Sequence, residues 1–96
     1  MSEKSKQRWI AENTDGSVTV KFDDRPLKID GTEVKSLQMR EPTVDDQLIA
    51  SKASSDAAEG EIALIANLCE VAPETVREFT MRQYRRLQAA LSGFMG

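Results

Sequence analysis

The sequence has no histidine and a single cysteine, and these two absences remove most common catalytic and metal-binding arrangements. Without an imidazole there is no Ser/His or Cys/His nucleophile pair and no histidine-ligated zinc site. One cysteine cannot form an intramolecular disulfide, which fits a reducing compartment. Cys69 falls on the apolar face of an expected helix, so we interpret it as a packing residue rather than a reactive thiol.

Long apolar runs, glycine-rich loops and calcium-loop spacing are also missing. No stretch approaches the roughly 20 apolar residues of a membrane span, and residues 1–8 lack a signal-peptide core, so a cytoplasmic location is expected. The five glycines are scattered, which excludes a phosphate-binding loop. The acid pairs at 23–24 and 45–46 fit turns and helix caps better than a calcium site. We therefore expect a protein that is not an enzyme, with no catalytic residues, no metal site and no cofactor.

The composition describes one ordinary globular domain. Of the 96 residues, 40% are hydrophobic and 30% are charged, which is enough for one modest core. The net charge is −3; residues 1–42 carry eight charges of each sign, whereas residues 43–96 carry five basic and eight acidic residues. Neither half has the basic surface typical of a nucleic-acid-binding protein.

Residues 1–16 are mostly polar and show no sustained hydrophobic period, so they are predicted to form a mobile N-terminal arm. Trp9, the only tryptophan, has two interpretations: it folds back over an edge or face of the domain, or it anchors a partner. The first is favoured because an amphipathic ring is most readily buried by its own chain. Residues 17–96 then form a single α+β domain, with a sheet over 17–40 and helices over 43–95.

Alternating apolar residues predict a three-stranded antiparallel sheet in the N-terminal half. Residues 18–22 give the first strand. Asp30 and Gly31 give a strong hairpin signal between the second and third strands. A two-residue turn there pairs Leu27 with Val34, so the three strands are expected to form a meander.

The third predicted strand, residues 32–39, has an internal change of parity. Val34 shares a face with the core residues of the second strand, but Leu37 and Met39 then fall on the opposite face. A bulge near Lys35 and Ser36 would return them to the core. Because an open sheet of this size is not stable alone, it needs a helical cover.

Met39, Arg40, Glu41, Pro42 and Thr43 form the junction between the strand-like and helical halves. Pro42 cannot donate a ladder hydrogen bond, and the Thr43 hydroxyl can cap a helix, so this motif ends the sheet and begins a helix. Arg40 and Glu41 keep two interpretations: an ion pair that fixes the turn, or a rim contact for a partner.

Three to four helices are expected to cover the sheet. The first runs from Thr43 to about Ala53, with Asp46 completing a capping box. The second is capped by Asp56 and is the most apolar, so it should lie deepest. The apolar stripe of the first helix is formed by Val44, Leu48 and Ile49.

The remaining helices begin at Pro73 and Thr80. Pro73 suits the first position of a short helix that ends near Glu78. Thr80 and Gln83 form a capping box at the start of the final helix. The expected buried face of that helix is formed by Tyr84, Leu87, Leu91 and Phe94.

Arg82, Arg85 and Arg86 lie in the first two turns of the final helix, where the helix dipole disfavours cations. Pairing with Glu74 and Glu78 of the preceding short helix is the favoured interpretation, and a contact surface for an acidic partner is the alternative. A helix-turn-helix role in DNA binding is a third interpretation, which the acidic balance of the chain disfavours.

Two groups of residues together suggest a family. The first is Val20 to Phe22, Pro26, Leu27, Ile29, Asp30, Gly31, Leu37, Met39, Arg40, Glu41, Pro42, Thr43 and Asp46; the second is Leu68, Cys69, Val71, Pro73, Glu74, Tyr84, Leu87, Gln88, Leu91, Gly93 and Phe94. This pattern resembles the tail assembly chaperone family of Mu-like and related tailed bacteriophages over roughly residues 18–95. Its most specific part is the motif from Arg40 to Thr43. Met39 replaces an expected leucine, and Gln83 replaces a more usual acidic residue.

The resemblance implies a small cytoplasmic chaperone from a phage or prophage tail gene cluster, absent from the mature virion. Its implied partners are the tape measure protein, the tail tube protein and a longer frameshifted form of itself; self-association stays open. The expected partner-binding residues are Leu91, Phe94 and Met95 in an apolar groove, with Arg82, Arg85 and Arg86 at its polar rim. The alternative is a small DNA-binding regulator that uses the final helix.

Overall fold

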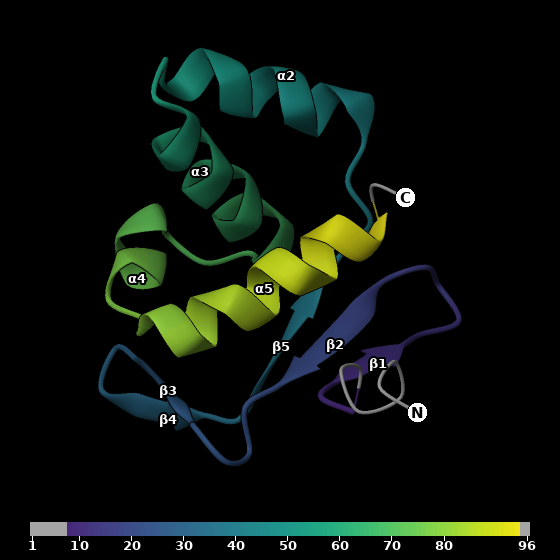
Figure 1. Ribbon diagram of the computed structural model, residues 1–96, viewed down its shortest axis with the longest axis vertical. Helices are drawn as coiled ribbons and strands as arrows, with labels where there is room; N and C mark the ends of the chain where they lie inside the picture. The colour runs from purple at the N-terminus through teal and green to yellow at the C-terminus, as the bar shows by residue number, and fades with distance from the viewer. Residues whose placement is uncertain (1–7, 95–96) are drawn as a thin grey trace.

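The computed structural model describes residues 8–94 and confirms the α+β class (Figure 1). In the described residues, five strands precede four helices. The strands are β1 (Ile10–Glu12), β2 (Val18–Lys21), β3 (Leu27–Ile29), β4 (Thr32–Val34) and β5 (Ser36–Met39). The helices are α2 (Val44–Ala53), α3 (Ala57–Cys69), α4 (Pro73–Arg77) and α5 (Met81–Phe94).

The main sheet has the strand order β1-β2-β5, which differs from the predicted meander. β2 pairs with β5 so that Val20 lies opposite Leu37, and β1 pairs with the other edge of β2 so that Ile10 also lies opposite Val20. The predicted mobile arm is therefore wrong for residues 10–12, because they cover an edge of β2 that would otherwise leave its hydrogen-bonding groups unpaired. Trp9 is half-buried against the core, which confirms its fold-back.

The second sheet is the two-stranded hairpin β3-β4, which projects beyond the main sheet (Figure 1). Its register, with Leu27 opposite Val34, is the predicted one. Asp30 and Gly31 both have positive φ, 52° and 78°, as a type I′ turn requires. The turn signal in the sequence therefore predicted the hairpin and its register correctly.

The irregularity predicted near Lys35 is present, but it is a change of sheet rather than a bulge. β4 ends at Val34, and β5 begins at Ser36 against β2. The backbone N–H of Phe22 donates to the Lys35 carbonyl over 2.7 Å, which holds the crossing point. Because β5 pairs with β2 and does not continue the hairpin, Leu37 can face the core without a bulge.

α3 and α5 cover the main sheet. α3 packs on β5, and α5 packs on β2 (Figure 1). Ile65 and Leu87, one from each helix, are fully buried in the same hydrophobic core as Val20 and Met39 of the sheet. The expectation that the second helix lies deepest agrees with its five buried residues, Leu64, Ile65, Ala66, Leu68 and Cys69.

α2 does not cover the sheet, which corrects the expectation for its apolar stripe. It packs on α3 and buries only Asp46 and Ala50. Val44, Leu48 and Ile49 are 81%, 52% and 54% exposed. Because α3 and α5 already occupy the inner face of the sheet, the stripe on α2 remains at the surface.

Candidate helix-binding grooves

The junction between β5 and α2 is built around the Asp46 carboxylate. Arg40 donates two hydrogen bonds to it, over 2.7 and 2.9 Å, and the Thr43 backbone N–H donates a third over 2.8 Å. The Thr43 hydroxyl donates a fourth over 3.0 Å, and the Asn67 amide of α3 donates a fifth over 3.2 Å. Hydrogen bonding from Arg40 and then from the Thr43 backbone holds the pKa of Asp46 well below its usual range. The junction therefore fixes α2 against both the sheet and α3.

This geometry supports the first of the two interpretations of Arg40. The residue forms an ion pair that fixes the turn, and the Thr43–Asp46 capping box is present as predicted. Pro42, which precedes Thr43 in the chain, is half-buried. Glu41 is exposed and forms no ion pair with any of residues 8–94.

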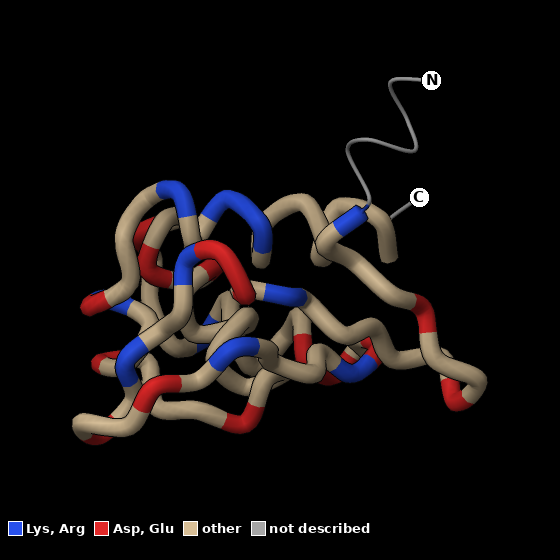
Figure 2. Tube along the Cα trace, turned by 90° about the horizontal axis from the view of Figure 1, so that it is seen from below, with Lys and Arg blue, Asp and Glu red and all other residues tan. Residues whose placement is uncertain are grey.

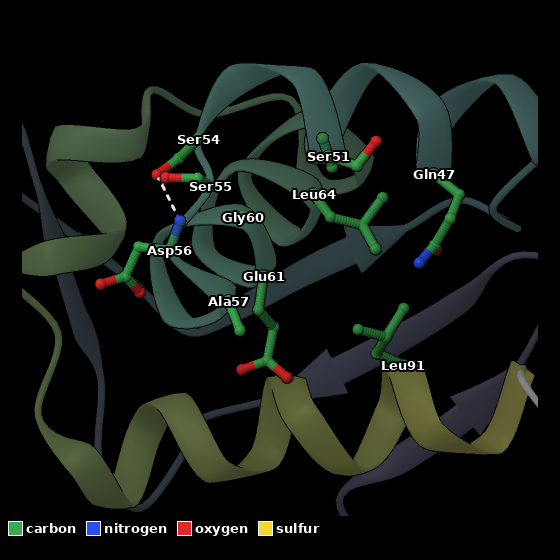
Figure 3. Close-up of a pocket in the computed structure, with 11 residues that line it drawn as sticks. Gln47, Ser51, Ser54, Ser55, Asp56, Ala57, Gly60, Glu61, Leu64 and Leu91 are labelled. Carbon is green, nitrogen blue, oxygen red and sulfur yellow. Dashed lines mark hydrogen bonds between the residues drawn. The ribbon is translucent and has the colours of Figure 1, made fainter.

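A groove of about 500 Å³ opens between α2 and α5, with α3 at its base (Figure 3). Its apolar lining comes from three helices: Ala50 of α2, Leu64 of α3 and Leu91 of α5. Figure 3 shows Leu64 and Leu91 projecting into the space between the helices. Leu91 was among the predicted partner-binding residues, and the structure places its side chain, 8% exposed, in this groove.

One residue of the exposed α2 stripe lies on the groove side of the helix. At about 100° per residue, the α2 residues that line the groove cover an arc of about 100°; they are Gln47, Ala50 and Ser51. Val44 lies about 70° from the centre of that arc, whereas Leu48 and Ile49 lie about 110° and about 150° from it. Val44 therefore extends the apolar surface of the groove, and Leu48 and Ile49 do not.

A second, smaller groove of about 360 Å³ lies between α3, α4 and the start of α5. Ile62, Val76, Phe79 and Met81 supply most of its apolar lining. Met81 is 61% exposed. An unbranched thioether side chain at the mouth of a groove can adapt to differently shaped partners.

Glu61 stands between the two grooves and lines both. Its Oε1 atom accepts hydrogen bonds from the Tyr84 hydroxyl over 2.7 Å and from the Gln88 amide over 2.8 Å. Burial, together with this bond to Glu61, raises the pKa of Tyr84 above its usual range. The bridge ties α3 to α5 and divides the apolar surface in two.

Arg86 has a structural role that was not predicted. It donates to both carboxylate oxygens of Asp24, over 2.9 and 2.8 Å, and to the Lys21 carbonyl over 2.9 Å. Its guanidinium also lies 5.6 Å from the Trp9 ring centroid and 5.7 Å from that of Phe22. The bond from Arg86 lowers the pKa of Asp24 to about 2. Arg86 thus secures the start of β1 and the β2–β3 turn to α5.

Arg82 and Arg85 are exposed on α5. The predicted pairing with Glu74 and Glu78 is wrong, because none of the three arginines forms an ion pair with either glutamate in the part of the chain that the structure describes. Acidic and basic residues are interspersed along the trace in Figure 2. This distribution is unlike the basic stripe that a DNA-binding helix needs.

The other two predicted partner residues lie elsewhere. Phe94 is half-buried against the core and lines a separate cavity of about 280 Å³ beside Ile10 and Ser17. Met95 lies outside the described residues. Glu61 was missed by sequence reasoning, because a glutamate one turn into an apolar helix looks solvated until the position of α5 is known.

The fold and this surface define a small α+β protein with two open apolar grooves and exposed apolar side chains on a neighbouring helix, features typical of proteins that bind other proteins. The family model described as "Phage tail assembly chaperone proteins, E, or 41 or 14" matches residues 19–96. The chain therefore belongs to the phage tail assembly chaperones, and its role is in tail assembly within the host cell. No curated protein and no solved structure matches it significantly. None of the helices in residues 8–94 is long and apolar enough to span a membrane.

Proposed function

We propose that this chaperone acts in the host cytoplasm without catalysis, by binding an amphipathic helix of the tape measure protein. Family membership supports a role in tail assembly. A long helical protein that must stay soluble before the tube forms around it exposes apolar stripes, and a chaperone can cover them with a groove that accepts one helix face. The helix remains bound until tube subunits replace the chaperone.

The groove between α2 and α5 is the observation that carries this proposal. Its floor is apolar, and Val44 continues that surface onto the exposed side of α2. Helix-in-groove recognition uses anchors at positions i, i+3 or i+4, and i+7 of the bound helix, which fill a cleft lined in this way. Leu91 contributes from the floor, as part of the predicted partner-binding set.

Arg82 and Arg85 line neither groove, and they are proposed as contacts for acidic residues on a part of the partner that lies outside the grooves. Both are exposed on α5 and free of ion pairs with residues 8–94. Arg86 is no longer part of this proposal, since its guanidinium is bound to Asp24.

Co-expression tests the proposal. The full chain is produced with the tape measure protein of the same phage, and the soluble fraction is purified through a tag on the chaperone. We expect the tape measure protein to become soluble and to co-purify. A tape measure protein that stays in the pellet, beside a soluble and folded chaperone, would refute the proposed function.

A further inference from the structure

We propose that Glu61 selects the partner helix by binding a lysine or arginine side chain at the middle of the apolar surface. This inference rests on the proposed function, because it names the chemistry of the helix that the groove takes. Glu61 is the one carboxylate among residues 8–94 that lines both apolar grooves. A cationic residue on a helix lying across either groove would come within reach of it.

The hydrogen bonds of Glu61 leave half of its carboxylate available. Both donors, the Tyr84 hydroxyl and the Gln88 amide, bind Oε1. Oε2 receives no hydrogen bond from the residues that the structure describes. Those residues include no buried polar side-chain atom without a partner, so Oε2 is at least partly exposed to solvent. A carboxylate oxygen can accept two hydrogen bonds, and Oε2 therefore has its full capacity free.

The charge of Glu61 is also uncompensated. Its two donors are neutral, and no lysine or arginine in residues 8–94 forms an ion pair with it. Other acids nearby are already engaged: Asp46 binds Arg40, and Asp56 caps α3 through the N–H groups of Ala58 and Glu59. Glu61 is thus held in position with a free oxygen and an unmatched charge.

The wider field around the groove has the same sign. Residues 43–61 supply α2, the following loop and the start of α3, and they contain five acidic residues and one basic residue. Two of these acids, Asp46 and Glu59, form ion pairs with arginines outside this segment, and the other three still outnumber the single lysine. A groove wall with an acidic balance attracts a basic helix and repels an acidic one. The apolar floor fixes the helix by its stripe, and Glu61 distinguishes helices by the charge beside that stripe.

Two designed peptides test this selection on the full chain. Both are amphipathic 18-residue helices with the same leucine stripe; one has lysine and the other has glutamate on its polar face. Affinity is measured by fluorescence anisotropy at low and at high salt. The variant Glu61→Gln keeps an oxygen acceptor for Tyr84 and Gln88 while removing the charge. Glu59→Gln is the matched control, since Glu59 is on the same helix but lines neither groove.

We expect the lysine peptide to bind the unmodified chain more tightly than the glutamate peptide, and more weakly as salt rises. Glu61→Gln should weaken the lysine peptide about fivefold, the effect expected for loss of one partly exposed ion pair. Glu59→Gln removes a charge that lies outside both grooves, and it should weaken the lysine peptide clearly less than Glu61→Gln does. Equal effects of the two variants, or equal affinity for the two peptides, would overturn the selection by Glu61.

The outcome can be separated from that of the proposed function. If the tape measure protein co-purifies but the two glutamate variants behave alike, binding in the groove is supported and selection by Glu61 is refuted. If neither peptide binds and the tape measure protein stays insoluble, both the proposed function and the selection by Glu61 are refuted.

Discussion

Arg40 and Asp46 form a two-point ion pair across the β5–α2 junction, with donor–acceptor distances of 2.7 and 2.9 Å. The Asp46 side chain is 8% exposed, so loss of Arg40 would leave a nearly buried carboxylate without its cation. We predict that Arg40→Ala lowers the free energy of unfolding by about 2 kcal/mol, measured by urea denaturation. Arg25→Ala is the control, because Arg25 is exposed and forms no ion pair with residues 8–94. An unchanged midpoint for Arg40→Ala would contradict a structural role.

The same carboxylate sets an acid-stability prediction. The folded-state pKa of Asp46 lies below the ordinary value of 3.8, so the ionised group stabilises the fold above that pH. This stabilisation is lost as the pH falls from about 4 toward the folded-state value. Asp46→Asn should therefore be less stable at pH 7 and should lose less stability between pH 5 and pH 2. The exposed Asp45→Asn should retain the original pH slope; a parallel slope for Asp46→Asn would count against the account.

We predict that Arg86 stabilises the fold, whereas Arg82 and Arg85 contribute to partner binding. Arg86→Gln removes the pair with Asp24 and the contacts with two rings, and we expect a loss of about 1 to 2 kcal/mol in the free energy of unfolding. The double variant Arg82→Gln, Arg85→Gln should keep the stability and reduce tape measure capture by about twofold to fivefold. Thermal denaturation and co-purification measure the two effects. Reversed results would assign the partner contact to Arg86.

Cys69 should not react with thiol reagents in the folded protein. It is 7% exposed, and burial raises the pKa of its thiol to about 12. At pH 8 the thiolate fraction is then on the order of a thousandfold below that of a free cysteine, and the reagent has little access. A thiol-reactive dye such as DTNB should label the protein only after denaturant is added. Rapid labelling of the native chain would show that the end of α3 opens readily.

Local signals in the sequence predicted the caps and turns well. The capping boxes at Thr43 and Thr80 and the turn at Asp30-Gly31 are present, since each depends on residues within four positions of one another. Pro73 also begins α4 as expected. Alternation gave the correct apolar faces of β2 and β5.

Pairings between distant segments could not be read in the same way. β2 pairs with β5 rather than with β3, and β1 adds to its other edge; these pairings depend on contacts between residues far apart in the sequence. The exposed stripe of α2 illustrates the same limit: spacing identifies an apolar face, but only the positions of α3 and α5 show that the sheet is already covered. Glu61 became a candidate once Tyr84 and Gln88 were seen beside it.

The most direct test compares two exposed β-branched side chains on different sides of α2. Val44→Gln and Ile49→Gln make comparable chemical changes at positions that are 81% and 54% exposed, and of the two only Val44 lies on the groove side of the helix. Each variant is co-expressed with the tape measure protein, and the amount captured per chaperone is measured after matching folded stability. We expect Val44→Gln to reduce capture about fivefold, as loss of one apolar anchor implies, and Ile49→Gln to leave it unchanged. Equal capture by the two variants, or a loss confined to Ile49→Gln, would contradict binding in the α2–α5 groove.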